Sequence, residues 1–182
     1  MTKSSENVRR MVLCAMFTAL VAVCSQIAVP MPWGVPINLA LFAVYMAGTM
    51  LGPVWGTASQ VVFIALAAIG VPVLANFSGG FDKFVGPTGG FLISFPIMAY
   101  IIGLGVEHRD AFKGAFPVAV VVGTVVNYIV GVILFVIVAH STVSVAVSAC
   151  VLPFIPTAII KAVLACVLGM NIRKRIPGVK KA

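Results

Sequence analysis

Long apolar segments with almost no charge dominate this chain and restrict the folds open to it. Hydrophobic residues make up 62% of the sequence and charged residues only 9%, whereas soluble domains usually carry about 25% charged residues. Inside a bilayer only helices and closed barrels satisfy their own backbone, and a spanning helix needs about 20 mostly apolar residues. The sequence therefore predicts an all-α integral membrane protein in contact with the lipid bilayer.

Six apolar segments are the predicted spans of a single membrane domain, residues 1–182. The second, third and fourth are short and have glycine and proline at their ends. Such spans are tolerated where neighbouring protein or a cavity satisfies the freed backbone groups. We expect a bundle of six transmembrane helices with a ligand cavity near its extracytoplasmic side. The spans are Val8–Val29, Asn38–Leu51, Val54–Gly70, Phe91–Val106, Pro117–Ala139 and Val143–Met170.

The sixth segment carries two prolines and a single charge. Pro153 and Pro156 each remove a backbone donor, so we expect a break near them and a new helix over Thr157–Met170. Lys161 would lie about one turn inside that helix. A lone lysine at membrane depth is costly and normally faces protein, a cavity or a partner.

Acidic partners for Lys161 are scarce. Three of the four acidic residues fall on the side of the predicted membrane opposite to the loop Val71–Gly90. Asp82 lies in the loop Val71–Gly90 and reaches Lys161 only if that loop closes over the bundle. We therefore expect an anionic ligand beside Lys161. The acidic residues are Glu6, Asp82, Glu107 and Asp110.

Basic residues are concentrated on one side of the predicted bundle, whereas the other side holds only Lys83. With six spans both termini share a side, and the positive-inside rule makes it the cytoplasmic one. The prediction is a multi-pass protein of a prokaryotic cell membrane with cytoplasmic termini. The net charge of +8 thus reflects topology, and we expect no nucleic-acid partner. The basic residues on the predicted cytoplasmic side are Lys3, Arg9, Arg10, Arg109, Lys113, Arg173, Lys174, Arg175, Lys180 and Lys181.

Signatures of catalysis, metal binding and nucleotide binding are absent from the sequence. His108 and His140 fall on opposite sides of the predicted membrane and cannot form one site. No GxxxxGK[ST] motif occurs, so any ATP would be hydrolysed by partner subunits. We expect no enzyme, no catalytic residue, no metal and no cofactor. The cysteines are predicted to be small buried hydrophobic residues, and they are Cys14, Cys24, Cys150 and Cys166.

Several motifs occur in an order that is typical of one family. Gly86–Pro96 reads GPTGGFLISFP, Gly70–Val73 reads GVPV, Phe77–Gly80 reads FSGG and Ala47–Pro53 reads AGTMLGP. They are similar to GPTGGYLLGFP, GLPV, FSGG and AGLLLGP in the BioY family. That family comprises the biotin-specific substrate-binding (S) components of energy-coupling factor (ECF) transporters. The resemblance spans most of Arg10–Gly169. It implies capture of biotin from outside and partnership with a transmembrane coupling protein and a pair of ATPases.

The loop Val71–Gly90 is predicted to be a lid over the cavity. Glycine permits close backbone approach to a ligand, and a closing loop gates binding. The loop also has polar side chains that can hydrogen-bond a ureido ring or a carboxylate. An ordinary flexible loop is the alternative. Its candidate substrate-binding residues are Asn76, Ser78, Asp82, Thr88 and Gly89.

Polar residues inside or at the ends of spans are further candidates. Asn127 and Tyr128 lie in the middle of the fifth span, and a buried amide needs a partner, either the ligand or another helix. Gln26 and Asn38 face the same choice at the ends of the first two spans. Lys161 matches the lysine of the family's PGDLIK pattern, which the resemblance implies is at the binding site.

Two departures from the family pattern affect the expected substrate. Ala158 stands where the family has aspartate, and Ala40 stands where it often has glutamine. Both changes would remove polar groups from pocket positions. Lipoate has the acid tail of biotin but an apolar ring, so lipoate or another small carboxylate vitamin is the alternative to biotin.

The first span carries small residues at helical spacing. Ala15 and Ala19 form an AxxxA pattern that Ala22 extends, and small residues let another helix approach closely in a membrane. The resemblance implies that this face docks on the coupling protein. For this face of the helix the alternative is packing within the chain. For the function as a whole, a further alternative is transport without ATPase partners.

Overall fold

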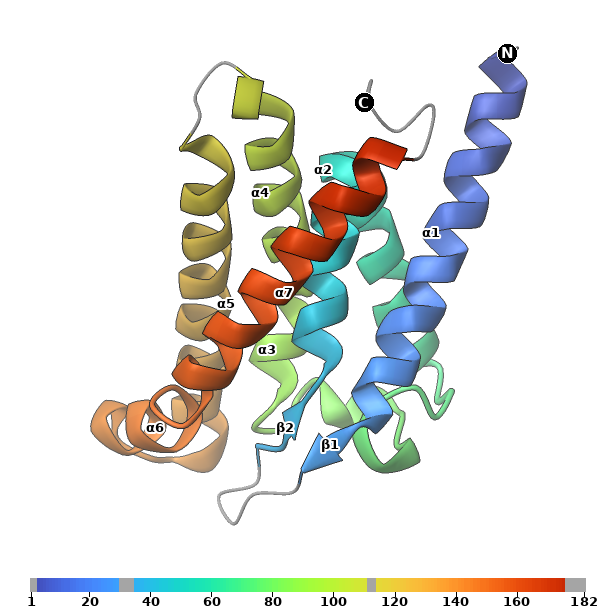
Figure 1. Cartoon of the computed structure of the whole chain (residues 1–182). Helices are drawn as coiled ribbons and strands as arrows, with labels where there is room; N and C mark the ends of the chain where they lie inside the picture. Colours follow the sequence, from blue (N-terminus) through green and yellow to red (C-terminus); the bar gives the residue numbers. More distant parts are fainter. Residues whose placement is uncertain (1–2, 30–34, 111–113, 176–182) are drawn as a thin grey trace.

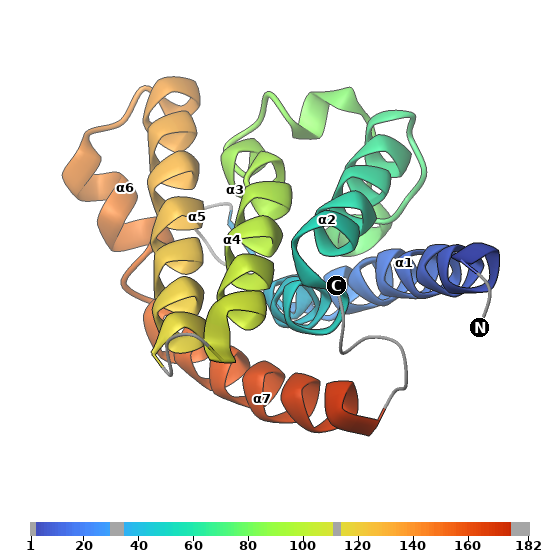
Figure 2. The same cartoon turned by 90° about the horizontal axis from the view of Figure 1, so that it is seen from above.

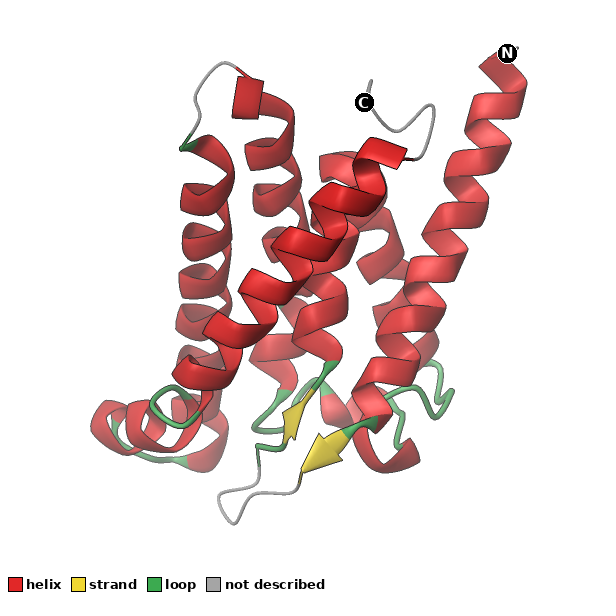
Figure 3. Ribbon diagram, in the orientation of Figure 1, coloured by secondary structure: helices red, strands yellow, loops and turns green. Residues whose placement is uncertain are grey.

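The computed structural model describes residues 3–29, 35–110 and 114–175 of the chain, without the side chains of Lys3, Ser4 and Lys174. Helices dominate, and a short antiparallel ribbon of two strands joins the first two of them (Figure 3). The elements are α1 (Lys3–Gln26), β1 (Ala28–Val29), β2 (Ile37–Asn38), α2 (Ala40–Ala68), η1 (Ala75–Phe77), η2 (Phe81–Lys83), α3 (Gly89–Ile93), α4 (Phe95–Glu107), η3 (His108–Asp110), α5 (Ala115–Ala139), α6 (Val143–Cys150) and α7 (Phe154–Arg175).

Five helical segments of the described residues are long and apolar enough to cross a membrane. Each has the length that the hydrocarbon core of a bilayer requires. The predicted all-α membrane architecture is therefore confirmed. The segments are Ser5–Gln26, Ala40–Ala68, Gly89–Asp110, Ala115–Ala139 and Phe154–Arg173.

The helix α2 folds back on itself at Gly52. Gly52 has φ 77° and ψ −173°, and Pro53 follows it. Glycine adopts a positive φ readily, and proline suits the first turn of a helix. A Cβ atom added at Gly56 would lie 3.1 Å from the carbonyl oxygen of Ala47, so the two halves pack side by side (Figure 1). These halves correspond to the predicted second and third spans, and the six-helix bundle is confirmed.

The predicted sixth span divides into two helices. The short helix α6 ends at Cys150 and α7 begins at Phe154, so the predicted break exists. The break lies at residues 151–153, which include Pro153, but α7 starts three residues before the predicted Thr157. Pro156 lies in the first turn of α7, where a missing N–H is not needed by the helix. Only α7 is long enough to span, while α6 lies beside one end of α5 (Figure 2).

The two ends of the bundle differ in their contents. The start of α1 and the end of α7 lie at one end, which we call the terminal end (Figure 1). The ribbon and the described loop Val71–Thr88 lie at the opposite end, the loop end. The described start of α1 and end of α7 therefore share one end of the bundle. The assignment of that side to the cytoplasm stays a prediction.

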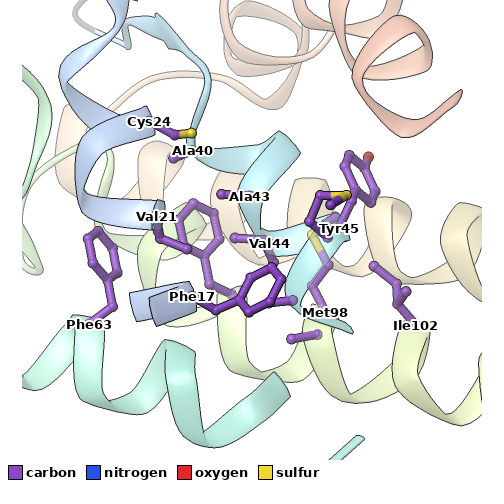
Figure 4. Packing of buried hydrophobic residues seen from close by; sticks show 14 of the residues in the cluster. Phe17, Val21, Cys24, Ala40, Ala43, Val44, Tyr45, Phe63, Met98 and Ile102 are labelled. Atoms are coloured by element: carbon purple, nitrogen blue, oxygen red, sulfur yellow. The ribbon is translucent and has the colours of Figure 1, made fainter. Parts of the chain in front are cut away.

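The main core lies between α1, α2 and α4. Phe17 and Val21 of α1 pack with Val44 and Phe63 of α2 and with Met98 of α4 (Figure 4). All four cysteines are free thiols. Cys14, Cys24 and Cys150 are buried, as predicted, whereas Cys166 is only half-buried.

The ribbon fixes where the second helix begins. Ala28 pairs with Asn38 and Val29 pairs with Ile37. The backbone N–H of Leu39 donates to the carbonyl oxygen of Cys24 at 3.2 Å, which ties the start of α2 to the end of α1. Asn38 is thereby held at the loop end of the bundle, next to the residues described below.

Candidate ligand-binding site

A cavity of about 420 Å³ lies under the loop Val71–Gly90, and we call it the loop cavity. A volume of this size suits a small-molecule ligand. Its wall combines the end of α1, the segment that leads into β2 and one residue of α3 with one side of the loop. The lining residues are Ser25, Val35, Pro36, Asn38, Leu74, Ala75, Asn76, Ser78, Asp82, Lys83, Gly86, Pro87, Thr88 and Leu92.

A smaller cavity of about 60 Å³ adjoins the loop cavity, and we call it the lysine cavity. The two share Val35, Pro36 and Asn38 in their walls, so together they form one site at the loop end. Four aromatic rings and a few polar groups surround the smaller space. Its lining residues are Val35, Pro36, Asn38, Leu41, Phe91, Phe95, Asn127, Tyr128, Phe154, Thr157 and Lys161.

Lys161 has a backbone partner. Its Nζ donates to the carbonyl oxygen of Asn38 at 2.6 Å, and only 8% of the residue is exposed. No carboxylate among the described residues forms an ion pair with it. The carbonyl satisfies one of three ammonium donors and supplies no negative charge. Lys161 thus faces protein and a cavity, as expected of a lysine in an apolar segment, and its charge lacks a counter-ion in the described part of the chain.

Asn127 and Tyr128 both line the lysine cavity, but their polar groups differ in partners. The amide Nδ2 of Asn127 donates to the carbonyl oxygen of Phe91 at 3.1 Å and to Ser94 Oγ at 2.7 Å. This nitrogen therefore joins α5 to α3, as the helix-packing alternative predicted. The hydroxyl of Tyr128 is buried without a hydrogen-bond partner in the described residues. It is thus one polar group of this pair that the described fold leaves for a ligand.

The candidate residues of the loop divide between cavity and packing. Asn76, Ser78, Asp82 and Thr88 line the loop cavity. Gly89 lines neither cavity. It is buried, and a Cβ atom there would overlap the carbonyl oxygen of Phe84, so its glycine serves close backbone packing.

Asp82 does not reach Lys161. Its Oδ2 lies 3.2 Å from Nζ of Lys83, and both side chains are largely open to solvent. An exposed ion pair of this kind contributes about 0–1 kcal/mol. The loop cavity is thus lined by a second lysine, Lys83, which is paired with the carboxylate of Asp82.

The two departures from the family pattern do not lie where they were expected. Ala40 is buried in the main core and lines neither cavity. Ala158 lines an apolar groove between α5 and α7. The premise that both alanines remove polar groups from the pocket was therefore wrong.

Several lining residues escaped the sequence analysis. Ser25 bonds its own helix through Val21 O, and Thr157 bonds Phe154 O, which is common for hydroxyl groups in helices. Phe91 and Phe95 offered a better signal, because they lie four residues apart directly after the glycine-rich motif. Their rings and Phe154 make the lysine cavity mainly apolar.

The predicted docking residues lie on α1. Ala15 and Ala19 are exposed, and Ala22 is half-buried. Larger apolar side chains around them, including Met11, Met16 and Val23, are also exposed. The AxxxA pattern is thus free to contact lipid or another helix.

Among the described residues no three His, Cys, Asp or Glu side chains gather to hold a metal ion.

The fold is similar to that of a solved structure. The chain matches the crystal structure of the S-component for biotin from an ECF-type ABC transporter, with a TM-score of 0.85 and 31% sequence identity. The match covers 96% of this chain and 95% of that one.

Curated relatives match over part of their length. The chain is 39% identical over 104 residues to the biotin transporter BioY of Thermotoga maritima, covering 57% of this chain and 61% of the relative. It is 47% identical over 93 residues to the probable biotin transporter BioY of Pyrococcus horikoshii, covering 51% and 57%. These alignments thus span less than two thirds of the relatives.

The family assignment rests on a longer match. The BioY family model matches residues 1–178, which is almost the whole chain. The motifs around the loop, the folded-back α2 and the helical bundle agree with that match. This multi-pass membrane protein therefore belongs to the BioY family.

Proposed function

We propose that this chain is the substrate-binding subunit of an ECF-type transporter and that its substrate is biotin. The observation that carries the proposal is the pair of adjoining cavities with the buried Lys161 at the inner one. Support comes from the relatives, which are named biotin transporters, and from the similar fold of a biotin S-component.

The chemistry of the two cavities suits the parts of biotin. A carboxylate near Lys161 would neutralise a charge that is costly to bury alone. A ureido group has donors and an acceptor, and the loop cavity offers Asn76, Ser78 and Thr88 for them. The aromatic walls of the lysine cavity suit the apolar part of the ligand.

The proposal includes the direction of capture and the partners. The loop end would face outside and the basic terminal end would face the cytoplasm, in accord with the positive-inside rule. Ala15, Ala19 and Ala22 would dock on the transmembrane coupling protein, whose pair of ATPases would supply the energy. The loop Val71–Gly90 would close over bound biotin before release inside.

The deciding experiment measures binding to the purified chain in lipid nanodiscs by titration calorimetry. We expect saturable binding of one biotin per chain, with lipoate as a weaker competitor. Tighter binding of lipoate, or no binding of biotin, would contradict the assignment. The two substitutions that favoured lipoate, Ala40 and Ala158, lie outside both cavities.

A second measurement addresses the partners. Vesicles that contain the chain alone should bind biotin but should not accumulate it. Vesicles that also contain a coupling protein and ATPase pair should accumulate it when ATP is present. Accumulation by the chain alone would overturn the dependence on ATPases while leaving the substrate assignment intact.

A further inference from the structure

Gln26, the last residue of α1, holds the loop end through both ends of its amide. Its Nε2 donates to the carbonyl oxygen of Pro72 at 3.2 Å, and its Oε1 accepts from the backbone N–H of Phe77 at 2.9 Å. The first of these backbone groups precedes η1, and the second belongs to the last residue of η1. Because one partner only accepts and the other only donates, the orientation of the amide is fixed.

The backbone beside this contact is strained. Asn76 and Phe77 have φ of 58° and 52°, in the left-handed region that side chains with a Cβ disfavour. Such residues persist only when their surroundings hold them. Phe77 is 75% exposed, so packing of its side chain does not hold the turn. The hydrogen bond from its N–H to Gln26 is one of the contacts that hold it, and it is the one that reaches α1.

The strained turn is part of the binding site. Asn76 lines the loop cavity, and the neighbouring backbone closes into a bridge in which the N–H of Leu74 donates to Ser78 O at 2.9 Å. Another bond ties the loop to α2, from the N–H of Gly80 to Ala67 O at 2.7 Å. Gln26 adds a link to α1, and it lines neither cavity itself.

We propose that Gln26 is a positioning residue that latches the lid loop onto α1, so that ligand exchange requires this latch to open. The proposal rests on the proposed function for its consequence, namely slow release of the ligand. Its physical content is independent of any ligand. The latch also connects the lid to the helix that carries Ala15 and Ala19, the proposed docking residues.

Hydrogen exchange on the ligand-free protein tests the latch directly. Gln26→Met has a similar length and lacks both hydrogen bonds, whereas Gln26→Glu keeps the acceptor for Phe77 and loses the donor to Pro72. We expect amides of residues 74–80 to exchange about tenfold faster in Gln26→Met, equivalent to ~1.4 kcal/mol, and less so in Gln26→Glu. The exposed neighbour supplies the control, because Ile27→Met should leave exchange unchanged.

A second variant separates positioning from a general structural role. Phe77→Gly removes the Cβ that makes the left-handed turn unfavourable. Added to Gln26→Met, it should restore at least half of the lost protection, after correction for intrinsic exchange rates. A defect at the end of α1 would not respond to glycine at residue 77, so absence of rescue would overturn the latch.

The ligand supplies the last readout. Chase of bound radiolabelled biotin should show about tenfold faster dissociation from Gln26→Met than from the wild-type chain, equivalent to ~1.4 kcal/mol. Unchanged dissociation in a variant whose loop exchanges faster would overturn the link to ligand release. If the wild-type chain binds no biotin, the proposed function fails, while the exchange measurements still decide whether the latch exists.

Discussion

Lys161 Nζ lies 2.6 Å from the backbone carbonyl oxygen of Asn38, so one hydrogen bond connects α7 with the start of α2. The contact places an ammonium group where the loop cavity and the lysine cavity meet, since Asn38 lines both. Two ammonium donors remain for other partners. The position of a buried charge is thus set by the fold before any ligand arrives.

Replacing Lys161 tests whether this ammonium binds the carboxylate of the ligand. Lys161→Met keeps the length of the side chain and removes the charge. Because a hydrogen bond to a charged group contributes ~1.5–3 kcal/mol, we expect about 10- to 100-fold weaker biotin binding by calorimetry. Biotin amide, which lacks the negative charge, should bind the wild-type chain and the variant with similar affinity.

The second lysine of the site provides the matched comparison. Lys83 lines the loop cavity but pairs with Asp82 and is more exposed than Lys161. Lys83→Met should therefore weaken biotin binding much less than Lys161→Met does. If only Lys83→Met removed the preference for biotin over its amide, Lys83 and not Lys161 would bind the carboxylate, and our assignment would be wrong.

The hydroxyl of Tyr128 gives a prediction in which stability and affinity change in different directions. It is buried without a partner in the described residues, and such a group costs about 1–3 kcal/mol. Tyr128→Phe should leave the melting temperature of the ligand-free protein unchanged or higher. Biotin binding should weaken by about threefold to tenfold, because a typical hydrogen bond contributes ~0.5–1.5 kcal/mol.

Tyr45 serves as the control for this experiment. Its hydroxyl lies 2.7 Å from Thr124 Oγ1, so it already has a partner within the fold. Tyr45→Phe should lower the melting temperature and leave biotin affinity nearly unchanged. Equal effects of the two substitutions on affinity would mean that the hydroxyl of Tyr128 does not contact the ligand.

Much of the site was predictable because polar residues stand out in apolar segments. Lys161, Asn127 and Tyr128 come from two distant segments, and all three line one small cavity. The glycine-rich loop likewise marked Asn76 and Thr88, which line the adjoining space. In a membrane protein a polar side chain in a span is costly, so its presence in the sequence is itself informative.

Other features depend on geometry that the sequence does not contain. Strands β1 and β2 are two residues each, too short for an alternating pattern, yet they place Asn38. Ala158 is three residues from Lys161, and such residues are rotated by about 60° on a helix with 3.6 residues per turn. That rotation directs Ala158 to the groove beside α5 and away from the cavities. Spacing alone could not decide this.

Arg173 illustrates a buried charge with a structural role at the terminal end. Its Nη1 donates to the carbonyl oxygens of Thr49 at 2.9 Å and Met50 at 3.3 Å, directly before the break at Gly52. Helix ends leave such carbonyls without intrahelical partners. Arg173→Met should therefore destabilise the protein by about 2 kcal/mol, which thermal unfolding in nanodiscs would detect. The exposed Arg175 provides the control, since Arg175→Met should change the melting temperature little.

The exposed alanines of α1 give a prediction that separates transport from binding. Ala15→Trp and Ala19→Trp place a large ring where a small surface permits close helix contact, so both should abolish ATP-dependent biotin accumulation in vesicles with the coupling module. Biotin affinity of the isolated chain should stay within about twofold of wild type, because both residues lie outside the two cavities. Ile133→Trp, on the exposed side of α5, should leave accumulation intact. Loss of binding with retained assembly would show that this face serves the fold and not docking.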